Sequence, residues 1–339
     1  MITASHLPDH PGPWPAADRG VVTDPSELFA LLGLEPDLLP AARRAAAVFG
    51  LRVPRSYIAR MRRGDPTDPL LRQVLPLDVE LEERSGFTSD PVGDLASGVV
   101  PGLLQKYRGR ALLITTGACG VNCRFCFRRE FPYSDQLASG GRMRDAMDRI
   151  AGDTSLHEVI LSGGDPLVLP AARLRALGDA IAAIPHVRRI RIHSRQPVVA
   201  PESVDEALLQ WFAQAPLPIV LVIHTNHARE LDATVEEALR RIAAHRVTLL
   251  SQSVLLRGVN DDLETLVELS ERLMEVGVLP YYLHLLDRVR GSGHFEVDEH
   301  RAVALHAALR ERLPGYLVPR LVRETAGAKS KTLVSGSGG

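Results

Sequence analysis

Short apolar segments alternate with amphipathic ones along most of the chain beyond residue 110. Six segments have the length and the Ile, Val and Leu content of buried strands, over 111–115, 158–162, 189–193, 219–224, 247–252 and 281–286. Segments with apolar residues at helical spacing separate and follow them, over 143–150, 171–184, 203–213, 233–244, 261–276 and 298–313. Strands and helices that alternate without a reversal predict a parallel sheet covered by helices.

The first part of the chain shows a different pattern, with short helical pieces separated by proline and glycine. Asp24 before Pro25 predicts the N-cap and the first position of a helix that continues to Leu34. After an irregular leader over 1–20, further helical pieces are expected over 38–49 and 56–63, and the helical pattern is expected to last until about residue 109. We therefore divide the chain into a leader and helical N-terminal segment over 1–100, a barrel over 101–313, and a C-terminal strand and tail over 314–339. The closing SGSGG is expected to be frayed.

The residues after the first predicted strand distinguish two kinds of parallel α/β fold. A doubly wound nucleotide-binding sheet has a glycine-rich turn at this position, whereas this chain has TTGACGVNCRFCFRR. The sequence thus favours an open six-unit (β/α) partial barrel, with its chemistry at the C-terminal ends of the strands.

Composition excludes several classes of function. The chain of 339 residues has 40 Lys and Arg against 41 Asp and Glu, a net charge of −1, which excludes a broadly basic nucleic-acid binder. No window approaches the roughly 20 apolar residues of a membrane span, and MITASHLPDHPGPWP does not resemble a secretion signal. Three cysteines are too few for a disulfide scaffold and suit a reducing cytoplasm, which is the expected location.

All three cysteines, Cys119, Cys123 and Cys126, lie within eight consecutive residues. On a helix they would share one face, but Gly117, Gly120 and Asn122, just before and among them, disfavour a regular helix. A structural zinc needs four ligands, and the next histidine downstream is His157. A four-iron cluster held by three thiolates leaves one iron open to a substrate or cofactor. We favour the cluster, with a zinc-stabilised non-catalytic protein as the alternative.

The sequence LSGGDP over 161–166 ends the second predicted strand. Consecutive glycines allow the backbone to approach a ligand closely, and the following carboxylate can accept from an ammonium group. The same residues also suit a plain β-turn. Together with the cysteine loop, the ligand-binding interpretation is favoured.

Only three lysines occur, Lys106, Lys329 and Lys331. Lysine can form an imine with a carbonyl compound and arginine cannot, so each lysine in this arginine-rich chain is of interest. The approach AGAKSK contains a glycine and follows a strand-like LVPRLV, which predicts that the tail reaches the barrel mouth. A lysine there could bind pyridoxal phosphate, and an exposed, flexible tail is the alternative.

The motif CxxxCxFC after the first barrel strand resembles the radical S-adenosylmethionine superfamily. The stretches KYRGRALLITTGACGVNCRFCFRREFPYS, LSGGDPL, RRIRIHSRQPVV, LLSQSVLLRGVNDD, PYYLHLLDRVRGSGHF and PGYLVPRLVRE…SKT resemble lysine 2,3-aminomutases, and among them the branch that serves β-lysylation of elongation factor P. This resemblance covers nearly the whole chain from about residue 20.

The resemblance implies three cofactors and their residues. A [4Fe-4S] cluster would be held by Cys119, Cys123 and Cys126. S-adenosylmethionine would contact Phe125, Gly163, Gly164, Asp165 and Gln252. Pyridoxal phosphate would form its imine with Lys331 rather than Lys329, because Lys331 lies seven residues beyond Glu324, as in the family. Arg110 is the candidate for its phosphate, since Lys106 stands where the free aminomutases have an arginine.

The resemblance also implies a substrate site. Arg128 would hold the carboxylate of lysine, and Asp287 and Glu324 would hold its distal ammonium. The alternatives are a surface cation, a turn cap and a solvated acid, respectively. Histidines at predicted strand ends are expected to be mostly structural, with one or two near a cofactor; these are His193, His224, His227 and His284.

The implied activity is that of an isomerase that converts (S)-α-lysine to (R)-β-lysine by radical migration of the amino group. The product would serve a lysyl-ligase that modifies elongation factor P, and flavodoxin or ferredoxin would supply the electron. An aminomutase of the same cofactors that acts on another amino acid is the alternative. Neither a nucleic acid nor a membrane is expected as a partner.

Overall fold

A ten-stranded sheet forms the centre of the computed structural model, which describes residues 20–137 and 141–335. Nearly all of the expected leader, and most of SGSGG, lie outside these residues. Seven consecutive strands of the sheet are parallel. They are β5 (Arg110–Thr116), β6 (Glu158–Gly163), β7 (Arg189–Ser194), β8 (Ile219–His224), β9 (Thr248–Val254), β10 (Leu279–His284) and β11 (Arg320–Arg323).

The sheet follows the chain order from β3 to β12, and in the described residues these outermost strands do not pair with each other. The predicted open parallel barrel is therefore confirmed. All six predicted strands are present, although β10 begins two residues earlier than expected. A seventh parallel strand, β11, comes from the segment LVPRLV.

Antiparallel strands extend both sides of the parallel sheet. On one side lie β3 (Gly98–Val100) and β4 (Leu103–Tyr107), and on the other lies β12 (Thr332–Leu333). The helical pattern expected until about residue 109 therefore stops at residue 97. The reason is local, because Gly102 adopts a left-handed φ of 89° between β3 and β4 and reverses the chain. The expected boundary after residue 100 falls in this turn.

The six predicted helices beyond residue 140 are confirmed, with ends shifted by up to three residues. Four of them begin at an aspartate whose side chain accepts a backbone N–H of the first turn, which stabilises that helix end. The helices are α6 (Gly141–Gly152), α7 (Ala171–Ala182), α9 (Glu206–Gln214), α10 (Ala233–Ala243), α11 (Leu263–Glu275) and α12 (Glu299–Arg312).

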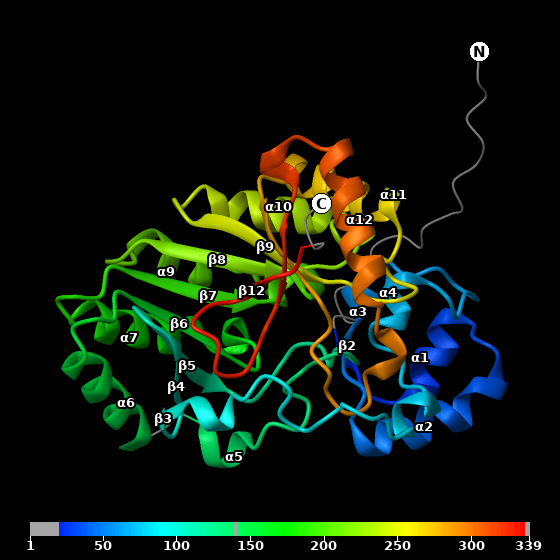
Figure 1. Cartoon of the computed structure of the whole chain (residues 1–339), viewed down its shortest axis with the longest axis horizontal. Coiled ribbons are helices and arrows are strands. Elements are labelled where there is room, and N and C mark those ends of the chain that lie inside the picture. Colours follow the sequence, from blue (N-terminus) through cyan, green and yellow to red (C-terminus); the bar gives the residue numbers. More distant parts are fainter. Residues whose placement is uncertain (1–19, 138–140, 336–339) are drawn as a thin grey trace.

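The main core lies between the strands and the helices α6 to α11. Figure 1 shows α6, α7 and α9 beside the strands β5 to β8, with α1 and α2 at the other side of the molecule. Along β7, Ile190 and Ile192 are buried in this core. The alternate side chains, Arg191 and His193, line a cavity on the other face of the strand. The two-residue period of a strand thus separates the core from the candidate site.

The N-terminal segment folds around a second core, to which Val121 and Val199 of the barrel also belong. Asp24 caps the first helix as predicted, with its carboxylate accepting from the Ser26 N–H at 2.9 Å. The elements of the segment are β1 (Val21–Val22), α1 (Pro25–Leu32), α2 (Leu39–Val48), β2 (Val53–Pro54), α3 (Arg55–Ile58) and α4 (Pro69–Arg72).

The helix expected over 56–63 ends at Ile58. Buried Asp68 accepts from the Arg62 N–H at 3.1 Å, and this contact holds the chain in a turn instead of a continued helix. Two further one-turn α-helices are α5 (Tyr133–Gln136) and α8 (Gln196–Val199). Short 3₁₀ turns are η2 (Pro36–Leu38), η3 (Asp78–Leu81), η4 (Leu95–Ser97), η5 (Pro166–Val168), η6 (Pro201–Ser203), η7 (Ala228–Glu230), η8 (Gly293–Phe295) and η9 (Gly315–Leu317).

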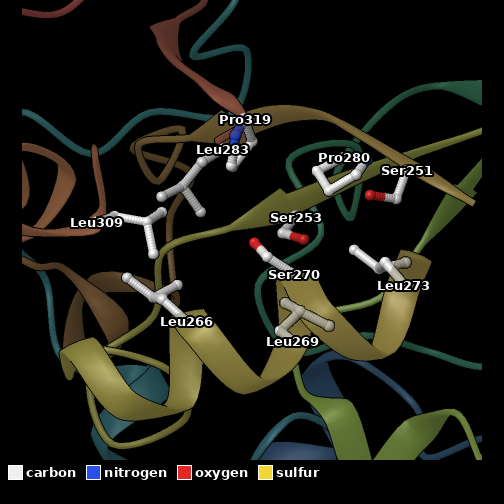
Figure 2. Close-up of a pocket in the computed structure, with 10 residues that line it drawn as sticks. All are labelled: Ser251, Ser253, Leu266, Leu269, Ser270, Leu273, Pro280, Leu283, Leu309 and Pro319. Carbon is white, nitrogen blue, oxygen red and sulfur yellow. The ribbon is translucent and has the colours of Figure 1, made fainter. Parts of the chain in front are cut away.

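A small cavity lies between α11 and the strands β9 and β10 (Figure 2). The hydroxyl-bearing side chains of Ser251, Ser253 and Ser270 and several leucines line it. Its volume of about 10 Å³ is close to the minimum for a single water molecule. It is therefore a packing feature of the fold and not a candidate ligand site.

Candidate functional site

One cavity of about 260 Å³ lies at the C-terminal ends of the parallel strands. Every site residue predicted from the sequence lines it, although they come from the cysteine loop, four strands or strand ends, and the tail. They are Arg110, Cys119, Cys123, Phe125, Cys126, Arg128, Gly163, Gly164, Asp165, Gln252, Asp287, Glu324 and Lys331. Lys329 is exposed and does not belong to the lining.

The cysteine loop follows β5 directly and lies against the end of β6. The N–H of Gly164 donates to the Thr116 carbonyl at 2.7 Å, and the N–H of Asp165 donates to the Ala118 carbonyl at 2.8 Å. A Cβ on Gly164 would lie 2.2 Å from the Ala118 carbonyl oxygen. A Cβ on Gly163, whose φ is 119°, would lie 2.5 Å from the Thr116 carbonyl oxygen. Both glycines are therefore required for the loop to lie where it does.

The thiols of Cys119 and Cys126 are in an environment that keeps them protonated when no metal is bound. Burial, with the neighbouring thiols as a further cause, raises the pKa of Cys119, and burial and Cys123 raise the pKa of Cys126 to about 11. Metal ions bind the deprotonated form, so cluster assembly here would release protons. A cation already faces one sulfur, because Nη1 of Arg195 donates to Sγ of Cys123 at 2.8 Å.

The arrangement of the thiols bears on the zinc alternative. In the described residues, no three His, Cys, Asp or Glu side chains are grouped so that they could ligate a single metal ion. A structural zinc needs four ligands around one centre, whereas a four-iron cluster binds its thiolates through different iron atoms. The three cysteines that line one cavity therefore fit the cluster better than zinc.

Arg128 belongs to a buried charge network that joins the cysteine loop to the N-terminal segment. Its Nε donates to Oδ2 of Asp94 at 2.7 Å, and its Nη1 donates to Oγ of Ser162 at 3.2 Å. Lys106 approaches the other Asp94 oxygen at 2.6 Å. Burial acts to raise the pKa of Asp94, but Arg128 and Lys106 outweigh it and lower the pKa. Arg128 is thus a fixed cation of the cavity wall and not a surface residue.

The tail forms a hairpin that brings Glu324 and Lys331 together. In the β11–β12 ladder Arg323 pairs with Thr332, so Glu324 and Lys331 are the next two residues facing each other. Nζ of Lys331 donates to Oε2 of Glu324 at 2.7 Å. The hydroxyl of Tyr107 donates to the other oxygen, Oε1, at 2.6 Å. The seven-residue spacing therefore places Glu324 and Lys331 opposite each other in the hairpin, and their ion pair holds the tail lysine inside the cavity.

Asp287 is the second carboxylate of this end of the cavity. It lies three residues beyond β10 and lines the cavity together with Glu324. Burial raises the pKa of Asp287 to about 7, and Lys331 partly opposes this effect. By contrast, Lys331 and Tyr107 outweigh the effect of burial on Glu324 and lower its pKa. One carboxylate of the pair is therefore charged at neutral pH and the other is close to its titration midpoint.

Three of the four histidines at strand ends line the cavity, and burial keeps them uncharged. Burial lowers the pKa of His224 to about 3 and lowers the pKa values of His193 and His284 well below the ordinary value. Among the residues that the structure describes, Nε2 of His193 and Nε2 of His284 are buried and have no hydrogen-bond partner. His224 contacts the amide of Gln252. Buried ring nitrogens without partners fit a cavity that takes a polar ligand.

The remaining predicted residues differ in how free they are to bind a ligand. The two carboxylate oxygens of Asp165 already accept from the N–H groups of Leu167, Arg195 and Gln196 and from the hydroxyl of Ser194. Its role toward a ligand stays a prediction, since these bonds hold β6 to β7. His227, the fourth histidine at a strand end, accepts from the Arg229 N–H and is structural.

Two residues that line the same cavity as Lys331 fit the requirements of pyridoxal phosphate. Nζ of Lys331 lies 5.6 Å from the ring centroid of Tyr282, so a flat aromatic side chain adjoins the reactive amine. Arg110 stacks on the ring of Tyr107 at 4.6 Å and forms no ion pair within the described part of the chain. An unpaired guanidinium at the cavity wall suits a phosphate group.

Sequence reasoning missed several residues of the cavity, of which Asp94, Tyr107 and Arg195 make the closest contacts with predicted ones. Asp94 comes from a segment expected to be helical, and nothing in its local sequence marks it. Arg195 follows directly after β7, and its position at a strand end was the available signal.

Comparison with characterised proteins gives clear relatives, although no family model matches the chain. The chain is 48% identical over 320 residues to the L-lysine 2,3-aminomutase of Escherichia coli (strain K12), covering 94% of this chain and 93% of the relative. It is 42% identical to the L-lysine 2,3-aminomutase of Haemophilus influenzae, over 94% and 95% of the two chains. It is 34% identical to that of Clostridium subterminale, over 82% and 67%.

Among solved structures, a radical SAM methyltransferase from Sphaerobacter thermophilus superimposes with a TM-score of 0.44 at 20% identity, over 65% of this chain and 68% of the other. The native anSMEcpe with bound AdoMet and a Cp18Cys peptide gives a TM-score of 0.45 at 11% identity, over 59% and 58%. Within the described residues, no helix combines the length and the apolar character that a membrane crossing requires.

Proposed function

The chain belongs to the L-lysine 2,3-aminomutase family, and on this basis we propose that it converts (S)-α-lysine to (R)-β-lysine. The observation that carries the proposal is the single cavity in which three thiols face a buried cation, two carboxylates and a lysine. These are the groups that a radical aminomutase of a dibasic amino acid needs, and they come from segments more than two hundred residues apart.

Three cofactors are part of the proposal. Cys119, Cys123 and Cys126 would hold a [4Fe-4S] cluster, S-adenosylmethionine would bind beside Phe125, Gly163, Gly164, Asp165 and Gln252, and Lys331 would bind pyridoxal phosphate with Arg110 at the phosphate. When bound, these groups supply the radical and the ring system over which an amino group can move. The protein supplies orientation, exclusion of water and charge complementarity.

The substrate fits the charges of the cavity. Arg128, fixed by Asp94, would hold the carboxylate of lysine in a two-point contact, for which a guanidinium is suited. Asp287 and Glu324 would hold the distal ammonium at the other end. Glu324 already accepts from an ammonium, that of Lys331, at 2.7 Å. This contact supports the choice of lysine over a substrate with an acidic side chain.

A role in the cell follows from the same proposal. The product β-lysine would be passed to a lysyl-ligase that attaches it to elongation factor P in the cytoplasm. Flavodoxin or ferredoxin would deliver the electron that reduces the cluster. These partners rest on the resemblance of the sequence to the branch that serves elongation factor P.

The test is a product analysis under anaerobic conditions. The protein is reconstituted with iron, sulfide and pyridoxal phosphate and incubated with (S)-α-lysine, S-adenosylmethionine and dithionite. We expect β-lysine, with the R enantiomer identified by chiral chromatography. If a β-amino acid forms from arginine or glutamate but not from lysine, that amino acid and not lysine is the substrate. If no β-amino acid forms from any of them, the proposed aminomutase activity is refuted.

A matched pair of tail variants separates the active lysine from its neighbour. Lys331→Ala should abolish turnover and the visible absorbance of bound pyridoxal phosphate, whereas Lys329→Ala should keep both, because Lys329 is exposed and lies outside the cavity. Equal absorbance in both variants would refute the assignment of Lys331.

A further inference from the structure

The guanidinium of Arg195 touches the cysteine loop from the barrel side. Arg195 follows β7 and is the N-cap residue of α8. Its Nη1 donates to Sγ of Cys123 at 2.8 Å, and the residue is only 6% exposed. A buried hydrogen bond from a permanent cation to a thiol is a strong interaction once the thiol becomes a thiolate.

Three groups hold the guanidinium in this position. Nη2 of Arg195 donates to the hydroxyl of Tyr57 at 3.1 Å, to Oε1 of Gln73 at 2.7 Å and to Oε2 of Glu230 at 3.0 Å. Tyr57, Gln73 and Glu230 are fully buried. The N-terminal segment thus contributes two of the groups that orient the cation toward Cys123.

Glu230 pairs with the cation through Nη2, whereas the thiol contact uses Nη1. Its Oε1 accepts from Nε2 of Gln73 at 2.9 Å and from the N–H of Asn226 at 3.1 Å, so its position is fixed as well. The positive member of the pair therefore makes the direct contact with Cys123. The orientation matters because in a buried site the nearer charge dominates the local potential.

We propose that Arg195 sets the reduction potential of the cluster bound at Cys123, raising it by stabilising the reduced state, and that Glu230 moderates this effect. The inference rests on the proposed function, since it requires a cluster on the three thiolates. Arg195 contacts a ligand of the cluster and acts through it, so it is a positioning and tuning residue.

The direction follows from charge. Reduction adds one electron from the donor to the cluster and its thiolates, which makes them more negative by one unit. A cation with a hydrogen bond to one of the sulfurs stabilises the reduced state more than the oxidised state, and hydrogen bonds to sulfur and net charge are known determinants of such potentials.

The test is an EPR-monitored redox titration of the reconstituted protein without S-adenosylmethionine. In Arg195→Gln the equilibrium constant for reduction should fall at least tenfold, which for one electron is a shift of about 59 mV to more negative potential. In Glu230→Gln the potential should shift in the opposite direction, because the cation loses its counter-charge while the amide oxygen can still accept from Nε2 of Gln73 and the N–H of Asn226. General loosening of the fold would not produce shifts of opposite sign.

The control is Arg229→Gln. Arg229 pairs with buried Asp68 at 2.6 Å and donates to the Arg60 carbonyl, so it joins the same two segments but does not contact the cysteines. The reduction potential of the cluster in Arg229→Gln should equal that in the unmodified protein. If Arg195→Gln does not bind a cluster, the direction of the potential shift in Glu230→Gln decides whether Arg195 tunes the potential.

The outcomes separate this inference from the proposed function. Failure of the unmodified protein to bind iron and sulfide would overturn both. A normal cluster whose potential is unchanged in Arg195→Gln, or a Glu230→Gln shift toward more negative values, would overturn the role of Arg195 alone and leave the aminomutase standing.

Discussion

The pH dependence of lysine use offers a quantitative test of the carboxylate pair. Burial raises the pKa of Asp287 to about 7, while the pKa of Glu324 is lowered. Of these two carboxylates and the three histidines that line the cavity, only Asp287 therefore changes charge between pH 6 and 8, because burial holds the pKa of His224 at about 3 and those of His193 and His284 well below the usual value.

The expected size of the effect follows from the titration curve. With a pKa of about 7, the Asp287 carboxylate is ionised in about one tenth of molecules at pH 6 and about nine tenths at pH 8. An ionised carboxylate attracts the distal ammonium of lysine and a protonated one does not. We expect the contribution of Asp287 to kcat/KM for lysine to rise about tenfold over this range.

The assay compares the protein with Asp287→Asn. Formation of β-lysine is measured under anaerobic conditions at pH values from 6 to 8, and kcat/KM of the unmodified protein is divided by that of the variant at each pH. Division removes other pH-dependent steps, such as deprotonation of the substrate amine, because both proteins share them. A ratio that stays constant with pH would refute the assignment of Asp287 to the ammonium.

Stability gives a second measurement of the same residue. A carboxyl group whose pKa rises from 3.8 to about 7 on folding binds its proton more tightly in the native state, so stability decreases as the pH rises from about 4 to about 7. The shift corresponds to up to about 4 kcal/mol. Asp287→Asn lacks this penalty and should unfold at a higher denaturant concentration at pH 8, with a smaller difference at pH 4.

Three further substitutions test other contacts of the site. Gly164→Ala places a methyl group 2.2 Å from a carbonyl oxygen of the cysteine loop and should lower bound iron several-fold, whereas Gly315→Ala, which meets nothing within 4 Å, should not; equal iron content would contradict this. Glu80→Gln leaves Arg124 buried without its carboxylate partner, so the free energy of unfolding from denaturant titration should fall by about 3–5 kcal/mol. An unchanged midpoint of the titration would refute this value. Tyr107→Phe removes a 2.6 Å hydrogen bond to the tail carboxylate and should raise KM for lysine about tenfold; a KM within about twofold of the original would show that this bond does not position the carboxylate.

The parallel strands were predictable because burial on both faces imposes continuous apolar runs, as in residues 158–162 and 219–224. Asp24 was predicted as a helix cap for the same kind of local reason, and four later helices have aspartate caps that were not predicted. The antiparallel strands β3, β4 and β12 were not predicted as strands. They are short, and each forms only because a turn brings it beside a neighbouring strand.

In the candidate site, too, residues marked by a local sequence pattern were predictable and residues defined by contacts in the folded chain were not. The cysteine loop and the glycines after β6 carry spacing that sequence alone makes visible. Asp94 carries none, since its importance comes from contacts with Arg128 and Lys106 that exist only in the folded chain. The four hydrogen bonds that Asp165 accepts were equally invisible, because they depend on the ends of β6 and β7 lying side by side in the folded chain.

The hairpin that carries Lys331 has an effect beyond the cavity. A long, unpaired edge of a sheet invites pairing with another copy of the chain, and natural proteins shorten or cover such edges. Here β12 covers β11 with only two residues, and the opposite edge, β3, has only three. Removal of the tail beyond Arg323 would therefore do more than delete the reactive amine, because it would uncover a strand capable of templating aggregation.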